Sequence, residues 1–202
     1  TTLAKRMKEI DRILSYDSLT RLTPAEKKTL WQERHLLVSH ANALPKFLLS
    51  VDYQDHSQVL QCYGLLTKWE KPTPEQAIEM LDARFTDPIV RSYAVSRLDS
   101  LKDEDCEQIA LQLCQVLKYE AYHDSALARF LLRRAYRNDK IGHRFFWNLR
   151  AELHIPEIRE RYSLLLEGYV RGIGSKKKAL VNQNEVMNSL IRVAGQTKKE
   201  TY

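Results

Sequence analysis

The sequence predicts an all-α protein whose helices form an α-solenoid, a stack of antiparallel helix pairs. Three observations lead to this fold class. No stretch shows the Val-, Ile- and Thr-rich alternation of apolar and polar residues that indicates a strand. The links between helices are short, which favours antiparallel neighbours and the stacking of successive pairs. Apolar residues recur at the spacing of an amphipathic helix over residues 2–14, 24–38, 56–69, 88–98, 104–118, 125–137, 139–153 and 156–171.

The expected helices begin at prolines and capping residues. Thr23-Pro24-Ala25-Glu26 is a capping box, in which the Thr23 hydroxyl accepts from the third helical N–H and the Glu26 carboxylate reaches back. Pro24 falls in the first turn, where a missing N–H costs nothing. Thr73-Pro74-Glu75-Gln76 repeats this arrangement. Further helix starts are expected at Asp87-Pro88, Asp124, Asn138 and Pro156.

One helix start has a more specific pattern. The residues from Asp87 to Ala94 resemble the start of a HEAT-type helix that begins at Pro88. In that pattern Val90 and Ala94 face the core, whereas Arg91 lies off that face. We therefore expect a HEAT-like stack with three segments: a linker and first helix at 1–22, a helical domain at 23–174, and an exit helix or linker at 175–202.

The composition is that of a globular protein without a disulfide framework. Of 202 residues, 44% are hydrophobic and 29% charged, so the chain can bury a sizeable core. No apolar run approaches the roughly 18 residues of a membrane helix. Because the chain begins with Thr1-Thr2 rather than Met, we expect a piece of a longer protein. We expect buried, reduced cysteines, as in a cytoplasmic protein, and tryptophans packed between helices, at Cys62, Cys106, Cys114, Trp31, Trp69 and Trp147.

The sequence offers no catalytic or metal-binding constellation. His123-Asp124-Ser125 contains the residue types of a hydrolase triad, but triad groups must converge in space, which three consecutive residues rarely achieve. The histidines and cysteines lack the spacing of zinc ligands. Gly172-Ile173-Gly174 follows a helical pattern, unlike a phosphate-binding loop that follows a strand. We therefore expect no catalytic residue, metal or cofactor in this segment.

The net charge of +6 comes from two basic stretches, residues 129–150 and residues 175–202. Residues 129–150 carry seven basic residues and one acidic residue. Arg129, Arg133 and Arg137 are spaced by four, so they share one stripe of a helix, where like charges repel unless partners neutralise them. The candidate docking face consists of Arg129, Arg133, Arg134, Arg137, Lys140 and Arg144.

Three interpretations of this basic face stay open. It can be a solvated face paired with carboxylates such as Glu152 or Glu157, a face that docks another domain, or a contact with anionic lipid or nucleic acid. Basic and aromatic residues do not interleave here as they do in nucleic-acid modules, so no nucleic-acid partner is expected.

The order of several segments carries a family resemblance. They are LPKFLLSV at 44–51, LLTKWEKPTPEQAIEMLD at 65–82, FTDPIVRSYAVSRL at 85–98, QLCQVLKYEAYHDSALARFLLRRAYRNDKIGHRFFWNLRAEL at 112–153 and RYSLLLEGYVRGIG at 161–174. This series resembles the helical accessory (PIK) domain of phosphoinositide 3-kinases over roughly residues 17–195. The uninterrupted passage from Lys118-Tyr119-Glu120 into the next helix is similar to class I enzymes.

The resemblance implies a scaffold that is not catalytic in itself. In that family, the kinase, lipid-binding and Ras-binding domains pack against the helical domain, and the parent enzyme phosphorylates inositol lipids with ATP and Mg²⁺. The Gly-Asp-Arg-His loop and the Asp-Phe-Gly motif of the kinase do not occur in these residues. They are expected beyond Tyr202 in a parent chain, together with the ATP and Mg²⁺ sites. The resemblance also implies a cytoplasmic location, with membrane recruitment of the parent enzyme.

The resemblance further implies a possible regulatory contact. In the family, acidic residues in the loop before a Leu-Trp helix receive a phosphotyrosine-binding domain of a regulatory subunit. Here that helix contains Leu30-Trp31, and Arg21 and Pro24 occupy the two acidic positions. An arginine facing a basic phosphotyrosine pocket would repel it. The residues of this possible contact are Asp17, Arg21, Thr23, Pro24 and Glu26.

A free-standing α-solenoid adaptor that binds a protein partner is the alternative. The two interpretations differ in the sequence expected after Tyr202: a kinase lobe indicates the scaffold, and a natural end of the chain indicates the adaptor.

Overall fold

The structure, a computed structural model, describes residues 2–200, with side chains for residues 4–196. The described residues form helices and no strand, which confirms the all-α prediction. The α-helices are α1 (Thr2–Leu14), α2 (Pro24–Gln32), α3 (Arg34–Leu37), α4 (Leu44–Leu48), α5 (His56–Leu66), α6 (Pro74–Glu79), α7 (Pro88–Leu98), α8 (Asp103–Val116), α9 (Ala126–Arg137), α10 (Asp139–Ala151), α11 (Pro156–Gly172) and α12 (Lys177–Glu200).

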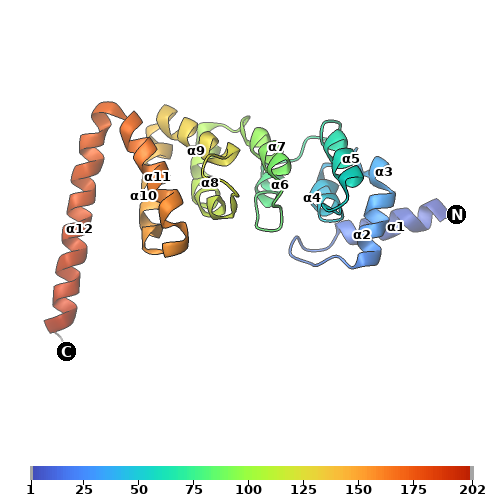
Figure 1. Cartoon of the computed structure of the whole chain (residues 1–202), viewed down its shortest axis with the longest axis horizontal. Helices are drawn as coiled ribbons and strands as arrows, with labels where there is room; N and C mark the ends of the chain where they lie inside the picture. Colours follow the sequence, from blue (N-terminus) through green and yellow to red (C-terminus); the bar gives the residue numbers. More distant parts are fainter. Residues whose placement is uncertain (1, 201–202) are drawn as a thin grey trace.

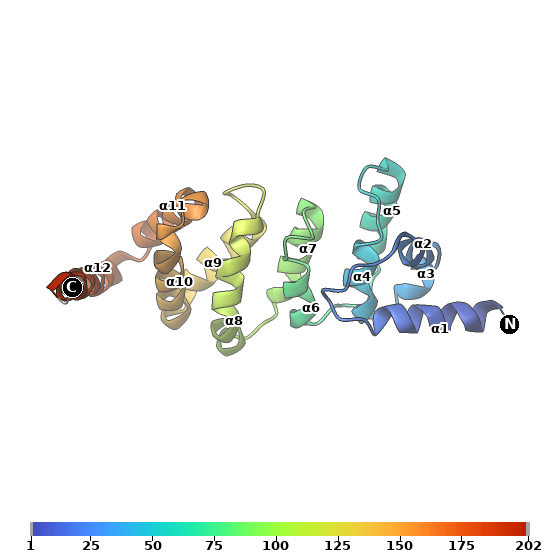
Figure 2. The same cartoon turned by 90° about the horizontal axis from the view of Figure 1, so that it is seen from below.

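The helices are stacked along one axis in chain order, as a solenoid requires. Figures 1 and 2 show the stack extending from α1 to α11, with α12 projecting from its end. Alternate helices contact each other: α7 packs on α9 and α9 on α11, while α8 packs on α10. Each helix thus contacts elements that are close to it in the chain, which is the arrangement of repeat proteins.

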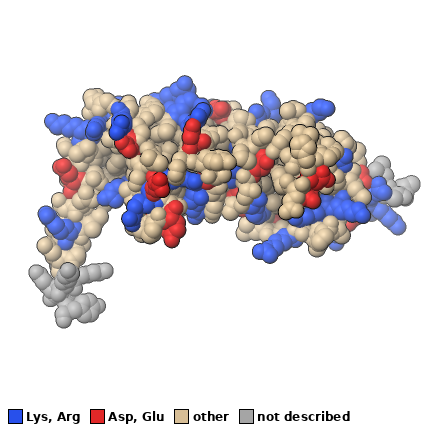
Figure 3. Space-filling model, in the orientation of Figure 1, with Lys and Arg blue, Asp and Glu red and all other residues tan. Residues whose placement is uncertain are grey.

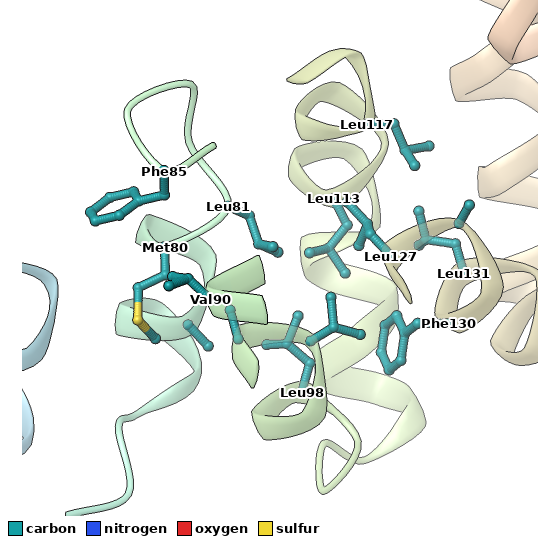
Figure 4. Close-up of a cluster of buried hydrophobic side chains, with 14 of the residues drawn as sticks. Met80, Leu81, Phe85, Val90, Leu98, Leu113, Leu117, Leu127, Phe130 and Leu131 are labelled. Carbon is teal, nitrogen blue, oxygen red and sulfur yellow. The ribbon is translucent and has the colours of Figure 1, made fainter. Parts of the chain in front are cut away.

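One continuous core runs through the stack. It begins at Ile10 and Ile13 of α1 and reaches Leu180 at the start of α12. Its central part lies between α6, α7, α8 and α9 (Figure 4). One buried side chain from each helix is Met80 at the end of α6, Val90 of α7, Leu113 of α8 and Phe130 of α9. Helices shorter than about 12 residues are marginal alone, so this shared burial is what stabilises the shorter ones.

The helix starts confirm most of the capping predictions. Thr23 Oγ1 accepts from Glu26 N at 3.3 Å, and Glu26 Oε2 accepts from Thr23 N at 2.8 Å. The Thr73 box has the same reciprocal bonds with Gln76. The carboxylate of Asp87 caps α7, and the side chain of Asn138 caps α10.

Two helix boundaries differ from the sequence prediction. The expected helix over 24–38 is interrupted at Glu33, where Arg34 Nη1 donates to the Trp31 carbonyl at 2.8 Å and so satisfies the end of α2. Ser125, rather than Asp124, caps α9, because the Asp124 carboxylate bonds the Arg129 guanidinium instead.

The cysteines and tryptophans lie where the sequence predicts. The cysteines are free and buried, and burial raises the pKa of the Cys62 and Cys114 thiols to about 12. Trp69 stacks on Phe47 with ring centroids 4.8 Å apart, and Trp31 stacks on the same ring at 6.0 Å. Trp147 packs edge-on against Phe146.

Candidate docking surfaces

The candidate sites in the described part of the chain are surface features. No group of His, Cys, Asp and Glu in it has the geometry of a metal site. The residues His123-Asp124-Ser125 do not act together, because Asp124 bonds Arg129 and Ser125 accepts from Ala128 N at 3.2 Å. No helix within residues 2–200 is long and apolar enough to cross a membrane.

The basic face is largely neutralised by carboxylates of the same domain. Arg129 makes a bidentate contact with Asp124, with both N–O distances 2.6 Å. Arg134 Nη1 donates to Asp103 at 2.8 Å, and its Nη2 donates to two backbone carbonyls. The further ion pairs are Arg133 with Asp99 and Arg144 with Glu107. Figure 3 shows basic and acidic side chains interleaved over this part of the stack.

These partners differ from those suggested by the sequence. Glu152 and Glu157 follow the far end of α10, and a 13-residue helix spans about 20 Å. The carboxylates that pair with α9 and α10 come instead from Asp124, just before α9, from the α7–α8 junction and from α8 itself. Hydrogen bonds from Asn138 and then Arg134 hold the pKa of Asp103 below its usual value.

Two cations of the basic face form no ion pair within the described residues. Arg137 and Lys140 have no hydrogen-bond or ion-pair partner through their side chains within the described residues. Both line a polar hollow whose other charged residues are four carboxylates and one lysine, Asp103, Glu104, Glu107, Asp139 and Lys176.

The two carboxylates of the possible regulatory loop, Glu26 and Asp17, differ in burial and in hydrogen bonding. Glu26 is only 7% exposed and accepts from Tyr16 Oη at 2.8 Å in addition to Thr23. These hydrogen bonds, the backbone one first, lower the pKa of Glu26. Asp17 is exposed, and its Oδ1 accepts from Leu19 N at 2.8 Å. Arg21 is exposed, and Pro24 begins α2, so the loop presents an arginine and only one exposed acid.

Arg91 is a buried residue that the sequence interpretation placed off the core face. Its guanidinium is enclosed between α7 and the end of α8, and the residue is 3% exposed. Nε donates to Glu120 at 2.7 Å, and Nη1 donates to the Phe85 carbonyl at 2.9 Å. The backbone acceptors explain the burial, because a buried arginine needs partners for most of its N–H groups.

The last helix presents an apolar stripe. Leu180 anchors the base of α12 in the core, and Arg150 holds it through Asn184 at 3.0 Å and Asn188 at 2.9 Å. Beyond this base the helix leaves the stack (Figure 1). Its large apolar side chains there are 43–62% exposed, at Val186, Met187, Leu190 and Ile191.

Comparisons with known proteins show which family the chain belongs to. The family described as "Phosphoinositide 3-kinase family, accessory domain (PIK domain)" matches residues 2–182. The chain belongs to this PIK accessory-domain family. It is 45% identical over 192 residues to phosphatidylinositol 3-kinase 2 of Dictyostelium discoideum, and 40% identical over 188 residues to phosphatidylinositol 3-kinase 1 of the same organism. These matches cover 95% and 93% of the chain, which spans about a tenth of the length of either relative, 10% and 12%.

Membership in the PIK family confirms the family resemblance that the sequence segments carry. The match includes α1 and the base of α12, both of which contribute to the core. The division into residues 1–22, 23–174 and 175–202, and the similarity to class I enzymes, stay predictions. Sequence reasoning missed the open pair Arg137 and Lys140 within the basic face, because the pairing of the other arginines depends on residues from α8 and its flanks.

Proposed function

We propose that this chain is the helical scaffold of a phosphatidylinositol 3-kinase, without catalytic activity of its own. The observation that carries this proposal is the exposed stripe of α12, in a chain whose relatives are much longer kinases. Contiguous apolar surface on a protein commonly indicates an interaction site. The anchored base of α12 fixes the direction in which the stripe is presented, as a scaffold requires.

The partners in this proposal are the kinase, lipid-binding and Ras-binding domains of the parent chain. The kinase domain is the proposed occupant of the α12 stripe, because it is expected to follow this segment. ATP and Mg²⁺ would bind in that domain and not in this one. The parent enzyme would be cytoplasmic and would be recruited to membranes through its other domains.

Two experiments test the proposal. A lipid-kinase assay with the purified 202-residue chain, ATP, Mg²⁺ and phosphatidylinositol should give no turnover above a protein-free blank. ATP-dependent turnover by the pure chain would overturn the non-catalytic role.

The second experiment separates the scaffold from the free-standing adaptor. Leu190→Asp with Ile191→Asp should leave the melting temperature of the 202-residue chain unchanged, because both side chains are already exposed. In the full-length parent, the same change should lower both stability and kinase activity. Leu60→Asp, at an exposed apolar position on α5, is the matched control and should have neither effect. Unchanged stability and activity of the full-length variant would remove the stripe as the carrier of the scaffold role.

A further inference from the structure

A small hollow lies beside the loop that joins α1 to α2. It has a volume of about 240 Å³ and no acidic residue in its lining. The loop, at residues 15–23, lies at the lower edge of the stack in Figure 1, and Figure 3 shows basic side chains gathered along that edge. The lining consists of Leu19, Thr20, Arg21, Leu22, Lys27, Leu49 and Arg84.

The loop beside this hollow is held in place by two other elements and by a hydrogen bond within the loop. Lys46 Nζ, from α4, donates to the Leu14 carbonyl at 2.9 Å and to the Tyr16 carbonyl. Arg84, from the turn before α7, donates to the Ser18 carbonyl. Together with the Asp17–Leu19 bond, these contacts fix the loop backbone. The hollow therefore exists before a ligand arrives, and binding loses little conformational entropy of the loop.

The positive charge of the hollow is not balanced within the domain. Arg84 is matched by Asp82, at 2.7 Å, and by Glu79, at 3.8 Å. Arg21 and Lys27 are exposed, and neither side chain has a hydrogen-bond or ion-pair partner in the part of the chain that the structure describes.

The acids nearest in sequence do not balance these two cations. Glu26 is buried in its capping box, where Arg12 lies 3.6 Å from its Oε1. Asp17 forms no ion pair among the described residues and accepts from a backbone N–H. The hollow thus presents two unmatched cations to any molecule that enters it.

An apolar group lies next to these cations. Leu19 is 74% exposed, and Leu22 and Leu49 are partly buried behind it. Leu19 also borders a second, larger groove, which continues towards Ile78 and Tyr119. A large apolar side chain presented on a fixed loop, beside unmatched cations, favours a ligand that has both an apolar and an acidic group.

We propose that this hollow binds an acidic peptide segment in which carboxylates flank one large apolar side chain. The apolar side chain packs on Leu19, Leu22 and Leu49. The carboxylates pair with Arg21 and Lys27, and the planar guanidinium can hold a carboxylate with two parallel hydrogen bonds. The volume is smaller than the roughly 300–1,000 Å³ of pockets that enclose small-molecule ligands, so the hollow fits one or two side chains of a peptide.

This proposal is independent of the scaffold role, since it concerns the opposite end of the stack from α12 (Figure 1). The test is fluorescence anisotropy of a labelled peptide whose Asp and Glu residues flank a single Leu, titrated with the 202-residue chain. We expect saturable binding that weakens as salt is added, because exposed charge pairs are screened. One comparison peptide has Asn and Gln in place of Asp and Glu, and another has Ser in place of Leu; both should bind more weakly.

Charge reversal locates the binding site. Arg21→Glu with Lys27→Glu should weaken binding by about tenfold or more, which corresponds to about 1.4 kcal/mol. Leu19→Ser should weaken it without changing its salt dependence. The matched control, Lys177→Glu with Lys178→Glu, makes the same change in net charge at exposed lysines of α12 and should leave affinity within about twofold, because α12 lies at the opposite end of the stack (Figure 1) and salt screens exposed charges that are far apart.

Three outcomes of the peptide titrations would overturn the proposal. They are an absence of peptide binding, an equal loss in the α12 control, and binding that is the same for the peptides with and without Leu. Vesicles of phosphatidylserine and phosphatidylcholine are titrated in parallel. Vesicle binding that depends on Arg21 and Lys27 while the peptide does not bind would assign the surface to a membrane and likewise overturn it.

Discussion

Arg91 and Glu120 form a buried ion pair, with 2.5 Å between Nη2 and Oε1, that joins α7 to the segment between α8 and α9. Neither residue is more than 8% exposed. Because Arg91 also donates to the Phe85 and Asp82 carbonyls, one guanidinium connects the α6–α7 turn with the end of α8. The pair lies near the middle of the stack, inside its continuous core.

Removing one partner of this pair should destabilise the domain strongly. Arg91→Ala leaves the Glu120 carboxylate buried without a counter-charge, and we expect a loss of about 3–5 kcal/mol in the free energy of unfolding. Arg91→Met with Glu120→Leu should cost much less, because no charge is left buried. Urea denaturation followed by circular dichroism measures both. Arg129→Ala, which breaks the exposed pair with Asp124, is the control and should hardly move the midpoint.

The capping box at Glu26 should make the stability of the domain depend on pH. The pKa of Glu26 is lowered in the folded chain, so its contribution to stability is present above its ordinary value near 4.5 and is lost as pH falls through the folded pKa. Glu26→Gln keeps the capping geometry, as the box at Thr73 and Gln76 shows, but cannot titrate. The difference in melting temperature between wild type and Glu26→Gln should therefore be constant near pH 7 and change below about pH 4. A difference that is flat down to pH 2 would contradict this role.

Two glycine substitutions should have opposite effects. A Cβ at Gly142 would lie 2.2 Å from Tyr169 Oη and 2.6 Å from the Ala135 carbonyl oxygen, so Gly142→Ala should destabilise by about 1–3 kcal/mol. A Cβ at Gly64, inside α5, would meet no atom within 4 Å, so Gly64→Ala should stabilise by about 0.5–1 kcal/mol. Thermal unfolding of the two variants tests the sign directly, and a stabilised Gly142→Ala would contradict the packing of α10 on α11.

The buried thiols should resist modification in the folded chain. Burial raises the pKa of Cys62 and Cys114 to about 12, so almost no thiolate is present at pH 8. Titration with an aromatic disulfide reagent should detect little reaction in the native protein and three thiols after unfolding in guanidinium. Rapid reaction of the native chain would show that the helix pairs around these cysteines open readily.

The sequence predicts the local features of this fold well and its long-range pairings poorly. Capping boxes at Thr23 and Thr73 depend on residues three apart, so the pattern is complete in the sequence. The partners of Arg133 and Arg134 come from residues more than 30 positions away, and no local pattern indicates them. The same limit applies to the hollow at Arg21 and Lys27, which depends on Arg84 and Leu49.

Arg91 is an intermediate case, because a signal for its burial exists in the helix itself. At 100° per residue, Arg91 lies between Val90 and Ala94 on one side and Val95 on the other, and Leu98 is almost in line with it. All four of these neighbours are buried, so Arg91 is near the centre of the core face of α7. A helical projection that includes Val95 and Leu98 would have indicated a buried arginine, although not its partner.

The projecting helix at the end of the stack has a mechanical consequence. Twelve of its 24 residues follow Asn188, the last residue tied to Arg150, and form a rod about 18 Å long, so a tilt of about 10° at Asn188 would displace the far end by about 3 Å. The base is small and is held by Leu180 and by the amides of Asn184 and Asn188 on Arg150. Arg150 therefore acts at the pivot of a lever, and a change there would be amplified along the rod while the rest of the stack stays in place.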